Sequence, residues 1–184
     1  MEHRSQKWNS NCETVDPEDT IFVLLCSSAR RPSQHLLPTL DSLYRSAFCP
    51  SRISCGIITS YGASSASEVL FPAGDADRET YPHASRFALK VRVCGQGEDR
   101  GAAAARATGI SAMYSHSRFL MLVDSRSTFS PDWDRTLVKA HGGKRARKRV
   151  LTGRGTQSDG SPEFAYVADM DSDGLPVCMS RRFA

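Results

Sequence analysis

The residue whose position points most clearly to chemistry is an aspartate that follows an apolar run. Asp124 comes directly after Phe119–Val123, which predicts a buried strand, and Ser125 and Arg126 follow it. A carboxylate at the end of such a strand is costly to desolvate unless it meets a partner there. That partner could be a metal ion, a ribose hydroxyl or a substrate amine. The alternative is a turn in which nearby backbone amides satisfy the carboxylate.

A second candidate is the glycine-led, alanine-rich segment DRGAAAARATG at residues 99–109. It predicts a helix that begins near Gly101 and carries Arg106 about a turn and a half further on. Backbone amides at the start of a helix, together with a nearby guanidinium, suit a diphosphate. The alternative is a tightly packed helix with Arg106 on its solvent-exposed face.

Strand and helix patterns alternate from residue 21 to residue 141, which predicts an α/β fold with helices on the faces of a sheet. Strands are expected at residues 21–26, 53–58, 87–93 and 119–123, and helices at residues 36–48, 102–116 and 132–140. Residues 62–86 are expected to form a long surface loop, and residues 1–19 a flexible lead-in. Residues 149–152 and 163–168 are candidates for further strands.

Ligands of open α/β sheets bind beyond the carboxyl ends of the strands. The segments expected at that edge are residues 27–30, 60–62, 95–101 and 124–126. We therefore predict that Asp124 and Arg126 lie together at the carboxyl end of a central strand. They should line a concave pocket toward which Arg106 projects.

Taken together, these segments resemble the GT-A glycosyltransferases, and particularly the polypeptide-hydroxyl GlcNAc transferases related to the Skp1 enzyme. The resemblance rests on IFVLLCSSARRPSQHLLPTLDSLYRSAFCPSRISCGI, VRVCGQGEDRGAAAARATGISAMY and FLMLVDSRSTFSPDWDRTL, with a fainter match in VADMDSDGLPVCMSRRF. It covers roughly residues 20–183, and only the amino-terminal, donor-binding portion of such an enzyme.

The resemblance implies a GT-A-like (Rossmann-type) mixed sheet with flanking helices, in a single truncated domain at residues 20–184 that lacks the acceptor half. Asp124 would be the first acid of the metal motif, and Arg126 would occupy its last position; these two are the catalytic candidates. The residues that would surround the donor are Ser27, Ser28 and Arg30 beside the uridine, Gly101, Arg106 and Ser125 near the nucleotide sugar, and Trp133 and Asp134 on a helix that frames the sugar pocket.

In enzymes of this family UDP-GlcNAc is the donor, and Mn²⁺ or Mg²⁺ bridges its phosphates. The sugar passes to a serine, threonine or hydroxyproline hydroxyl of an acceptor protein, with retention of configuration. Arg126 departs from the pattern, because a hard cation needs an oxygen or imidazole ligand and a guanidinium has no lone pair to offer. Arg126 could supply the metal's charge at the diphosphate. The alternative is a catalytically inactive homologue that acts as a binding or scaffold module.

Composition adds weaker constraints. The formal net charge of +4 suits an anionic ligand, and much of the excess lies in the run KRARKR at residues 144–149. Nucleic-acid binding is not favoured, since no aromatic residue is interleaved in that run. No apolar stretch is long enough for a membrane span, so we expect a soluble chain in the cytoplasm, with the Golgi lumen as the alternative. Buried free thiols are favoured over disulfides for Cys26, Cys55 and Cys94.

Overall fold

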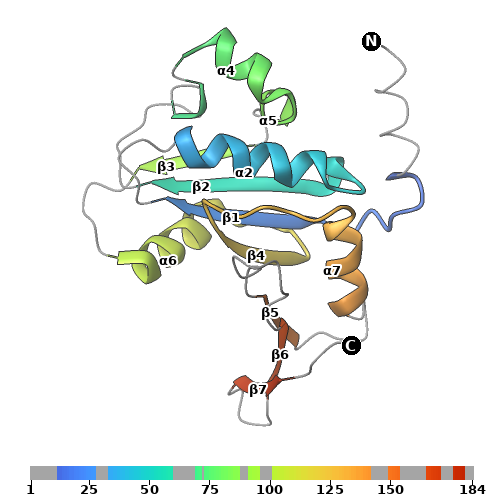
Figure 1. Ribbon diagram of the computed structural model, residues 1–184. Coiled ribbons are helices and arrows are strands. Elements are labelled where there is room, and N and C mark those ends of the chain that lie inside the picture. Colours follow the sequence, from blue (N-terminus) through green and yellow to red (C-terminus); the bar gives the residue numbers. More distant parts are fainter. Residues whose placement is uncertain are drawn as a thin grey trace. The chain divides into compact units, whose positions relative to one another are not determined.

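Four parallel strands form the main sheet, in the spatial order β3-β2-β1-β4 (Figure 1). In chain order they are β1 (Ile21–Ser27), β2 (Ile53–Thr59), β3 (Val91–Gly95) and β4 (Phe119–Asp124). The structure is a computed structural model, and it describes residues 12–27, 33–59, 69–71, 73–87, 91–95, 101–141, 149–153, 165–170 and 176–180. The chain divides into two compact units, Met1–Arg135 and Thr136–Ala184, and the main sheet belongs to the first.

Helices cover both faces of the main sheet. α2 (Ser33–Arg45) lies on one face and α6 (Gly101–Met113) on the other (Figure 1). The remaining helices are the 3-10 turn η1 (Pro50–Arg52), α4 (Asp75–Thr80), α5 (Pro82–Phe87) and α7 (Trp133–His141). The central strand β1 is buried along Ile21–Leu25, as an apolar strand covered on both faces should be. The predicted α/β fold is therefore confirmed.

The packing of α6 identifies which side chains lie on its face of the sheet. Phe22 and Leu24 of β1 form a core cluster with Met113 of α6, and Cys26 packs against the same cluster. Gly109 lets the helix come this close, because a Cβ there would lie 2.8 Å from Leu24 Cδ1. Side chains alternate along a strand, so the other residues of β1 face α2.

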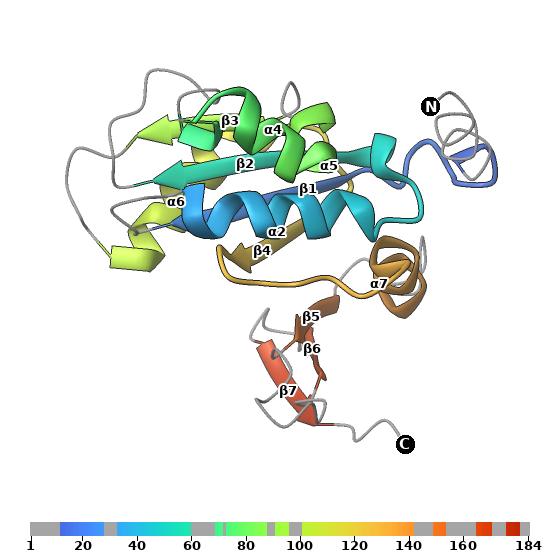
Figure 2. The ribbon, with the colours of Figure 1, turned by 45° about the horizontal axis from the view of Figure 1, so that its top comes forward.

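The segment after β4 runs beside α2 toward α7 (Figure 2). Thr39 Oγ1 donates to the carbonyl of Ser125 at 2.7 Å, at the start of this segment. Near its end, the backbone amide of Asp132 donates to the carbonyl of Ser46 at 2.7 Å. Since α2 runs antiparallel to the strands, these contacts carry the chain from the carboxyl-terminal edge of the sheet back to its amino-terminal edge.

Residues 62–86 differ from the expected loop, because they contain the two short helices α4 and α5. A side chain from α2 caps α5, since the Asp41 carboxylate accepts from the amides of His83 and Ala84 at 2.9 and 3.4 Å. Tyr44 also stacks on Phe87 with ring centroids 4.5 Å apart. Both contacts join residues about forty positions apart, so the local sequence carries little sign of them. The third strand consequently begins at Val91 rather than at Phe87.

Residues 12–19 are held against the sheet, although we expected them to belong to a flexible lead-in. A disulfide joins Cys12 to Cys49, across a sequence separation of 37 residues. Arg118 Nη1 donates to Asp19 Oδ1 at 2.6 Å, which ties the end of this segment to the start of β4. Residues 1–11 lie outside the described part of the chain.

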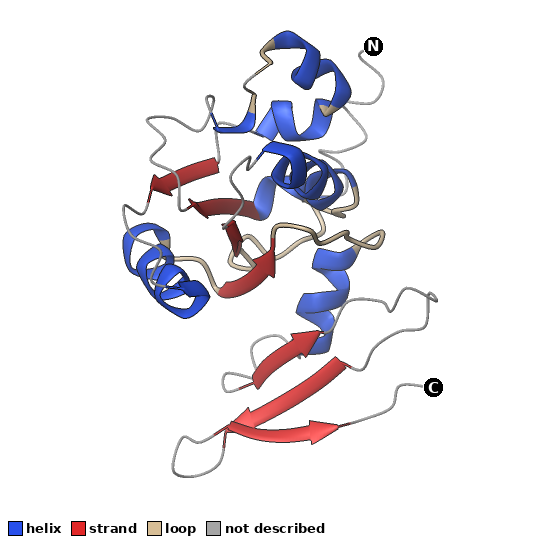
Figure 3. Cartoon of the chain, turned by 60° about the vertical axis from the view of Figure 1, so that its left-hand side comes forward, coloured by secondary structure: helices blue, strands red, loops and turns tan. Residues whose placement is uncertain are grey.

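The second unit contains an antiparallel sheet in the order β5-β6-β7 (Figure 3). Its strands are β5 (Arg149–Gly153), β6 (Ala165–Met170) and β7 (Pro176–Ser180). The first two agree with the strands considered from the sequence, whereas β7 was not expected. None of the described helices, in either unit, is long and apolar enough to cross a membrane.

Candidate functional site

Two strands and one helix bring three polar groups together at the carboxyl-terminal edge of the main sheet. Cys26 of β1 and Asp124 of β4 are register partners on neighbouring parallel strands. Cys26 lies on the α6 face, and its register partner shares that face. The positive charge of Arg106, in the second turn of α6, acts on the Cys26 thiol. The edge therefore combines a carboxylate, a thiol and a guanidinium.

The electrostatics of Cys26 report on this grouping. Burial raises the pKa of the thiol above its ordinary value, and the negative charge of Asp124 adds to the increase. The positive charge of the Arg106 guanidinium lowers the pKa of the same thiol. Since Arg106 and Asp124 both act on the Cys26 sulfur, the two side chains belong to the same edge of the sheet.

Asp124 also begins a turn. Its Oδ1 accepts the backbone amide of Arg126 at 3.0 Å, and its carbonyl accepts the amide of Ser127 at 3.2 Å. This is the turn considered as the alternative from the sequence. The turn uses one oxygen of the Asp124 carboxylate and leaves Asp124 exposed. Arg126 is exposed as well. The turn and a ligand contact are therefore compatible at Asp124.

β4 is an edge strand of the four-stranded sheet, not the central strand that we expected under Asp124. Other predicted donor residues lie nearby but face differently. Ser27 is buried on the α2 face, one position beyond Cys26, and Ser125 is buried with its carbonyl bound by Thr39. Gly101 begins α6, while Ser28 and Arg30 lie outside the described residues.

Asp134 lies elsewhere than the sugar pocket implied by the resemblance. It is fully buried at the amino-terminal edge of the sheet, where it contacts the residues that precede β2 in the chain. Its carboxylate accepts the amides of Phe48 and Cys49 at 2.7 and 3.0 Å, and Arg52 Nε at 3.0 Å. Arg52 Nη2 lies 2.8 Å from the same carboxylate. These contacts close the connection between α2 and β2, so Asp134 has a structural role.

Trp133 is placed in the same way. Its Nε1 donates to the carbonyl of Leu43 in α2 at 2.9 Å, and its ring packs 5.0 Å from that of Phe129. The side chain is 6% exposed. Trp133 therefore anchors the first turn of α7 to α2, at the edge of the sheet opposite Asp124. The sequence pattern singled out Trp133 and Asp134, but it did not indicate that they contact α2 and the residues before β2.

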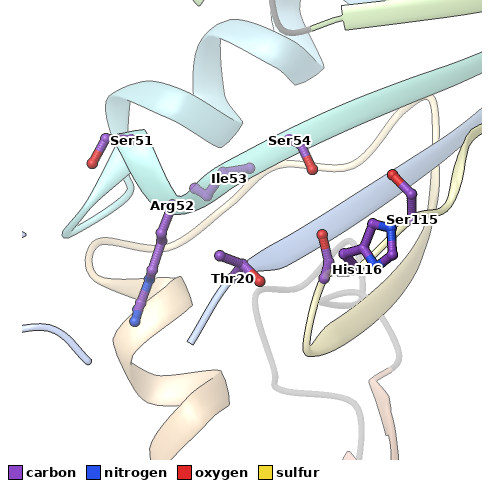
Figure 4. A pocket seen from close by; sticks show the side chains of 8 residues that line it. Thr20, Ser51, Arg52, Ile53, Ser54, Ser115 and His116 are labelled. Carbon is purple, nitrogen blue, oxygen red and sulfur yellow. The ribbon is translucent and has the colours of Figure 1, made fainter. Parts of the chain in front are cut away.

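A cavity of about 340 Å³ also lies at the amino-terminal edge. Its lining consists of Thr20, Ser51, Arg52, Ile53, Ser54, Ser115, His116 and Ser117 (Figure 4). Arg52 extends from it toward α7, where its guanidinium is neutralised by Asp134. The lining therefore offers hydroxyls and one exposed imidazole, but no carboxylate. This lining could accept many small polar molecules. The charged groups at the carboxyl-terminal edge suit a nucleotide more specifically.

A metal ion fits the described part of the site poorly. The described residues contain no group of three or more histidine, cysteine, aspartate or glutamate side chains that could hold one. Asp124 supplies one carboxylate, whose Oδ1 accepts the backbone amide of Arg126, and the positive charge of Arg106 acts at the neighbouring Cys26. A dication there would be repelled by fixed positive charge. The two arginines instead provide charge suited to phosphate oxygens.

The comparisons with known proteins agree with this fold. Residues 74–157 match the family model described as Glycosyltransferase (GlcNAc), a match that includes both Arg106 and Asp124. The S. aureus TarS 1–349 structure aligns with a TM-score of 0.51 and 13% identity, covering 78% of this chain and 38% of that one. The same protein in complex with UDP gives the same values. No curated protein matches the chain in sequence.

A mannosyltransferase from Pyrobaculum calidifontis, in complex with GDP-Man and Mn²⁺, aligns with a TM-score of 0.44 and 15% identity, over 70% of this chain and 36% of that one. An alignment of this quality supports no conclusion about the site. The likeness to TarS, at its low identity, shows the fold alone. The chain spans 38% of the TarS 1–349 structure, so that fold is represented in part.

The structural comparison shows the fold, and the family match agrees with it. The main sheet with its flanking helices is a GT-A-type glycosyltransferase fold, as the sequence predicted. The match to the GlcNAc glycosyltransferase family model covers residues 74–157, less than half of the chain, so it does not by itself assign an activity. The narrower resemblance to the polypeptide-hydroxyl GlcNAc transferases is a matter for proposal.

Proposed function

We propose that this chain is the donor-binding portion of a glycosyltransferase that uses UDP-GlcNAc and transfers the sugar to a hydroxyl of an acceptor protein. The observation that carries the proposal is the grouping of Arg106 and Asp124 at the carboxyl-terminal edge of the sheet. Ligands of α/β sheets bind at that edge. The family match supports GlcNAc as the sugar, and UDP is the nucleotide bound by the structural neighbour TarS.

The proposed chemistry is electrostatic. Transfer breaks the bond between the anomeric carbon of the sugar and the oxygen of the β-phosphate, and the bonding electrons leave with UDP. Arg106 and Arg126 would stabilise the negative charge that develops on the departing diphosphate. Asp124 would orient the donor through a hydroxyl or amide of the nucleotide sugar. The oxygen of the acceptor hydroxyl forms the new bond to the anomeric carbon, and its proton passes to a phosphate oxygen of the departing UDP.

A non-catalytic homologue that binds a nucleotide sugar, and serves as a binding or scaffold module, is the second candidate. Arg126 favours it, because this residue stands where the resemblance expects a metal ligand. Both candidates require a donor site, so donor binding does not separate them. Only the enzyme turns the donor over. Release of UDP from UDP-GlcNAc, measured with a coupled nucleotide assay, separates the enzyme from the binding module.

Calorimetric titration with UDP-GlcNAc tests the donor site. We expect Arg106→Ala to weaken binding about tenfold or more, the loss of one charge-assisted hydrogen bond. Arg92→Ala is the matched control, since Arg92 is an exposed arginine on β3, away from the carboxyl end of that strand. Equal affinities of wild type and Arg106→Ala would contradict the proposed site. If Arg106→Ala and Arg92→Ala lost the same affinity, the effect would come from the net positive charge and not from a specific contact of Arg106.

The disulfide bears on the compartment. Disulfides such as Cys12–Cys49 persist in oxidising compartments and are rare in the cytosol. We therefore favour the Golgi lumen, the alternative to the cytoplasmic location expected from the sequence. Mass spectrometry of non-reduced peptides from the native protein should recover Cys12 and Cys49 as a linked pair. Recovery of both cysteines as free thiols would contradict the Golgi location and favour the cytoplasm.

A further inference from the structure

We propose that β4 is a dimerisation edge, which pairs antiparallel with β4 of a second copy of this chain and joins two main sheets into one. In the described part of the chain, β4 has a neighbouring strand on one side only (Figure 1). A free strand edge is a template for pairing with another strand. The inference goes beyond the proposed function, because it assigns a partner to this edge of the sheet.

The backbone of β4 is arranged for such pairing. The amide of Phe119 donates to the carbonyl of Thr20 at 3.0 Å, so Phe119 and every second residue after it direct their backbone groups toward β1. Successive residues of a strand direct these groups to opposite sides, so those of Leu120 and Leu122 point to the open edge. An added strand would receive hydrogen bonds from both residues.

The side chains of β4 form an exposed apolar patch. Among the described residues, the exposed large apolar side chains are Tyr114, Leu120 and Leu122. The ring centroids of Tyr114 and Phe22 lie 5.7 Å apart, and Phe22 is the register partner of Leu120, so these side chains share one surface. α6 packs over β1, β2 and β3, and Leu120 and Leu122 stay 40% and 46% exposed. A contiguous patch of this kind marks an interaction surface.

The two edges of the sheet differ in their protection against pairing. β3, at the other edge, carries the exposed Arg92, and a charged side chain on an edge strand discourages pairing. β4 has the sequence FLMLVD, which contains no lysine, arginine or proline. The contrast favours β4 as the edge that pairs.

A second copy of β4 is complementary to this edge. Residues that face each other across antiparallel strands share a face of the sheet, and pairing centred on Met121 sets Leu120 of each copy opposite Leu122 of the other. The same register sets Arg118 opposite Asp124. Apolar pairs and opposite charges are both favourable across strands. A shift of two residues in either direction would set a leucine opposite a charged residue, so the sequence selects this register.

The charged residues are available for the contact. Arg118 Nη1 donates to Asp19 Oδ1 at 2.6 Å, and a guanidinium carries five N–H donors, so it can also reach a second carboxylate. Asp124 is exposed, and its Oδ1 accepts the amide of Arg126 in the turn. Oδ2 of the same carboxylate can therefore accept from Arg118 of the second copy.

Sedimentation equilibrium of the full chain, at about 1 to 200 µM, measures the association. We expect a reversible dimer in the wild type. Leu120→Lys or Leu122→Lys should raise its dissociation constant at least tenfold, because each places a charge opposite a leucine twice in the dimer. Leu120→Glu combined with Leu122→Lys should restore the dimer, since opposite charges then face each other. Ser111→Lys, at an exposed position of α6, is the control and should leave the association unchanged.

Cross-linking tests the register. Met121→Cys should form an intermolecular disulfide on mild oxidation, because position 121 faces its own copy with about 4.5 Å between Cα atoms. Val123→Cys is the control, since its copy would lie roughly 13 Å further along the strand. Mass spectrometry of linked peptides separates the introduced link from any link through the native cysteines.

A wild type that stays monomeric at about 200 µM, well above a micromolar dissociation constant, would overturn the inference. So would a dimer that neither lysine substitution weakens. Cross-linking as ready through Val123→Cys as through Met121→Cys would contradict the pairing centred on Met121. None of these measurements uses a nucleotide, so they decide dimerisation whether or not the chain binds UDP-GlcNAc.

Discussion

Replacing Asp134 should destabilise the fold without affecting donor binding. The Asp134 carboxylate is fully buried and accepts two backbone amides, of Phe48 and Cys49, and the guanidinium of Arg52. The Arg52 side chain is itself only 7% exposed. Asp134→Ala would therefore leave a buried positive charge and two amides without their acceptor.

The magnitude follows from that geometry. Breaking a buried ion pair by removing one partner costs roughly 3–5 kcal/mol, because the remaining charge is uncompensated. The two amides add to the loss, although water entering the site would recover part of it. For a chain of this size, a loss of about 3–5 kcal/mol lowers the melting temperature by roughly 6–20 °C. Arg52→Met in the Asp134→Ala background should restore part of the stability, since it removes the unpaired charge.

Urea denaturation followed by circular dichroism measures this effect. Lys139→Ala is a suitable control, because Lys139 is exposed in the same helix, and it should change the free energy of unfolding by less than about 0.5 kcal/mol. UDP-GlcNAc affinity of folded Asp134→Ala should match the wild type. A stable Asp134→Ala protein with weakened donor binding would refute the structural role and restore Asp134 to the sugar pocket.

Three further predictions follow from the same structure. UDP-GlcNAc binding should be insensitive to Mn²⁺ and to chelators in calorimetry, and Arg126→Asp should make it metal-dependent, because the change adds a ligand and removes a positive charge; a tenfold gain with Mn²⁺ in the wild type would contradict this. Gly109→Ala should lower stability by about 1 kcal/mol in denaturant titrations, since its methyl group would lie 2.8 Å from the buried Leu24 Cδ1, and this overpacking outweighs the gain in helix propensity. Burial raises the pKa of the Cys55 thiol, so the folded state keeps it neutral while the unfolded chain ionises above about pH 8.5. Stability should therefore fall as pH rises beyond that value, by up to about 1.4 kcal/mol per pH unit, and Cys55→Ala should show a shallower fall between pH 8.5 and 10.

Much of the main sheet could be predicted because its signals are local. Apolar runs identified β1, β2 and β4, and the alanine-rich segment identified α6. The α/β pattern predicted that ligands bind beyond the carboxyl ends of the strands, and this placed Asp124 near the start of α6. The expectation that Arg106 projects toward Asp124 followed from this topology together with the family pattern.

The remaining features depend on contacts between distant residues. Trp133 and Asp134 belong to a segment that crosses from one edge of the sheet to the other, and nothing in its sequence reveals that path. The capping of α5 by Asp41 and the pairing of Cys12 with Cys49 are likewise long-range. Cys26 could have been considered from its position before Ser27, but a cysteine in an apolar run is more often a small core residue.

Chemical-shift mapping with UDP compares the two edges of the sheet in one experiment and so decides where the donor binds. We expect UDP to perturb the backbone amides of Cys26, Asp124 and Arg126, and the Nε of Arg106, in a saturable manner. The amides around the cavity at His116 and Ser54 should remain unchanged. Perturbations confined to that cavity, or saturable binding that leaves Arg106 and Asp124 unaffected, would contradict the placement of the donor site.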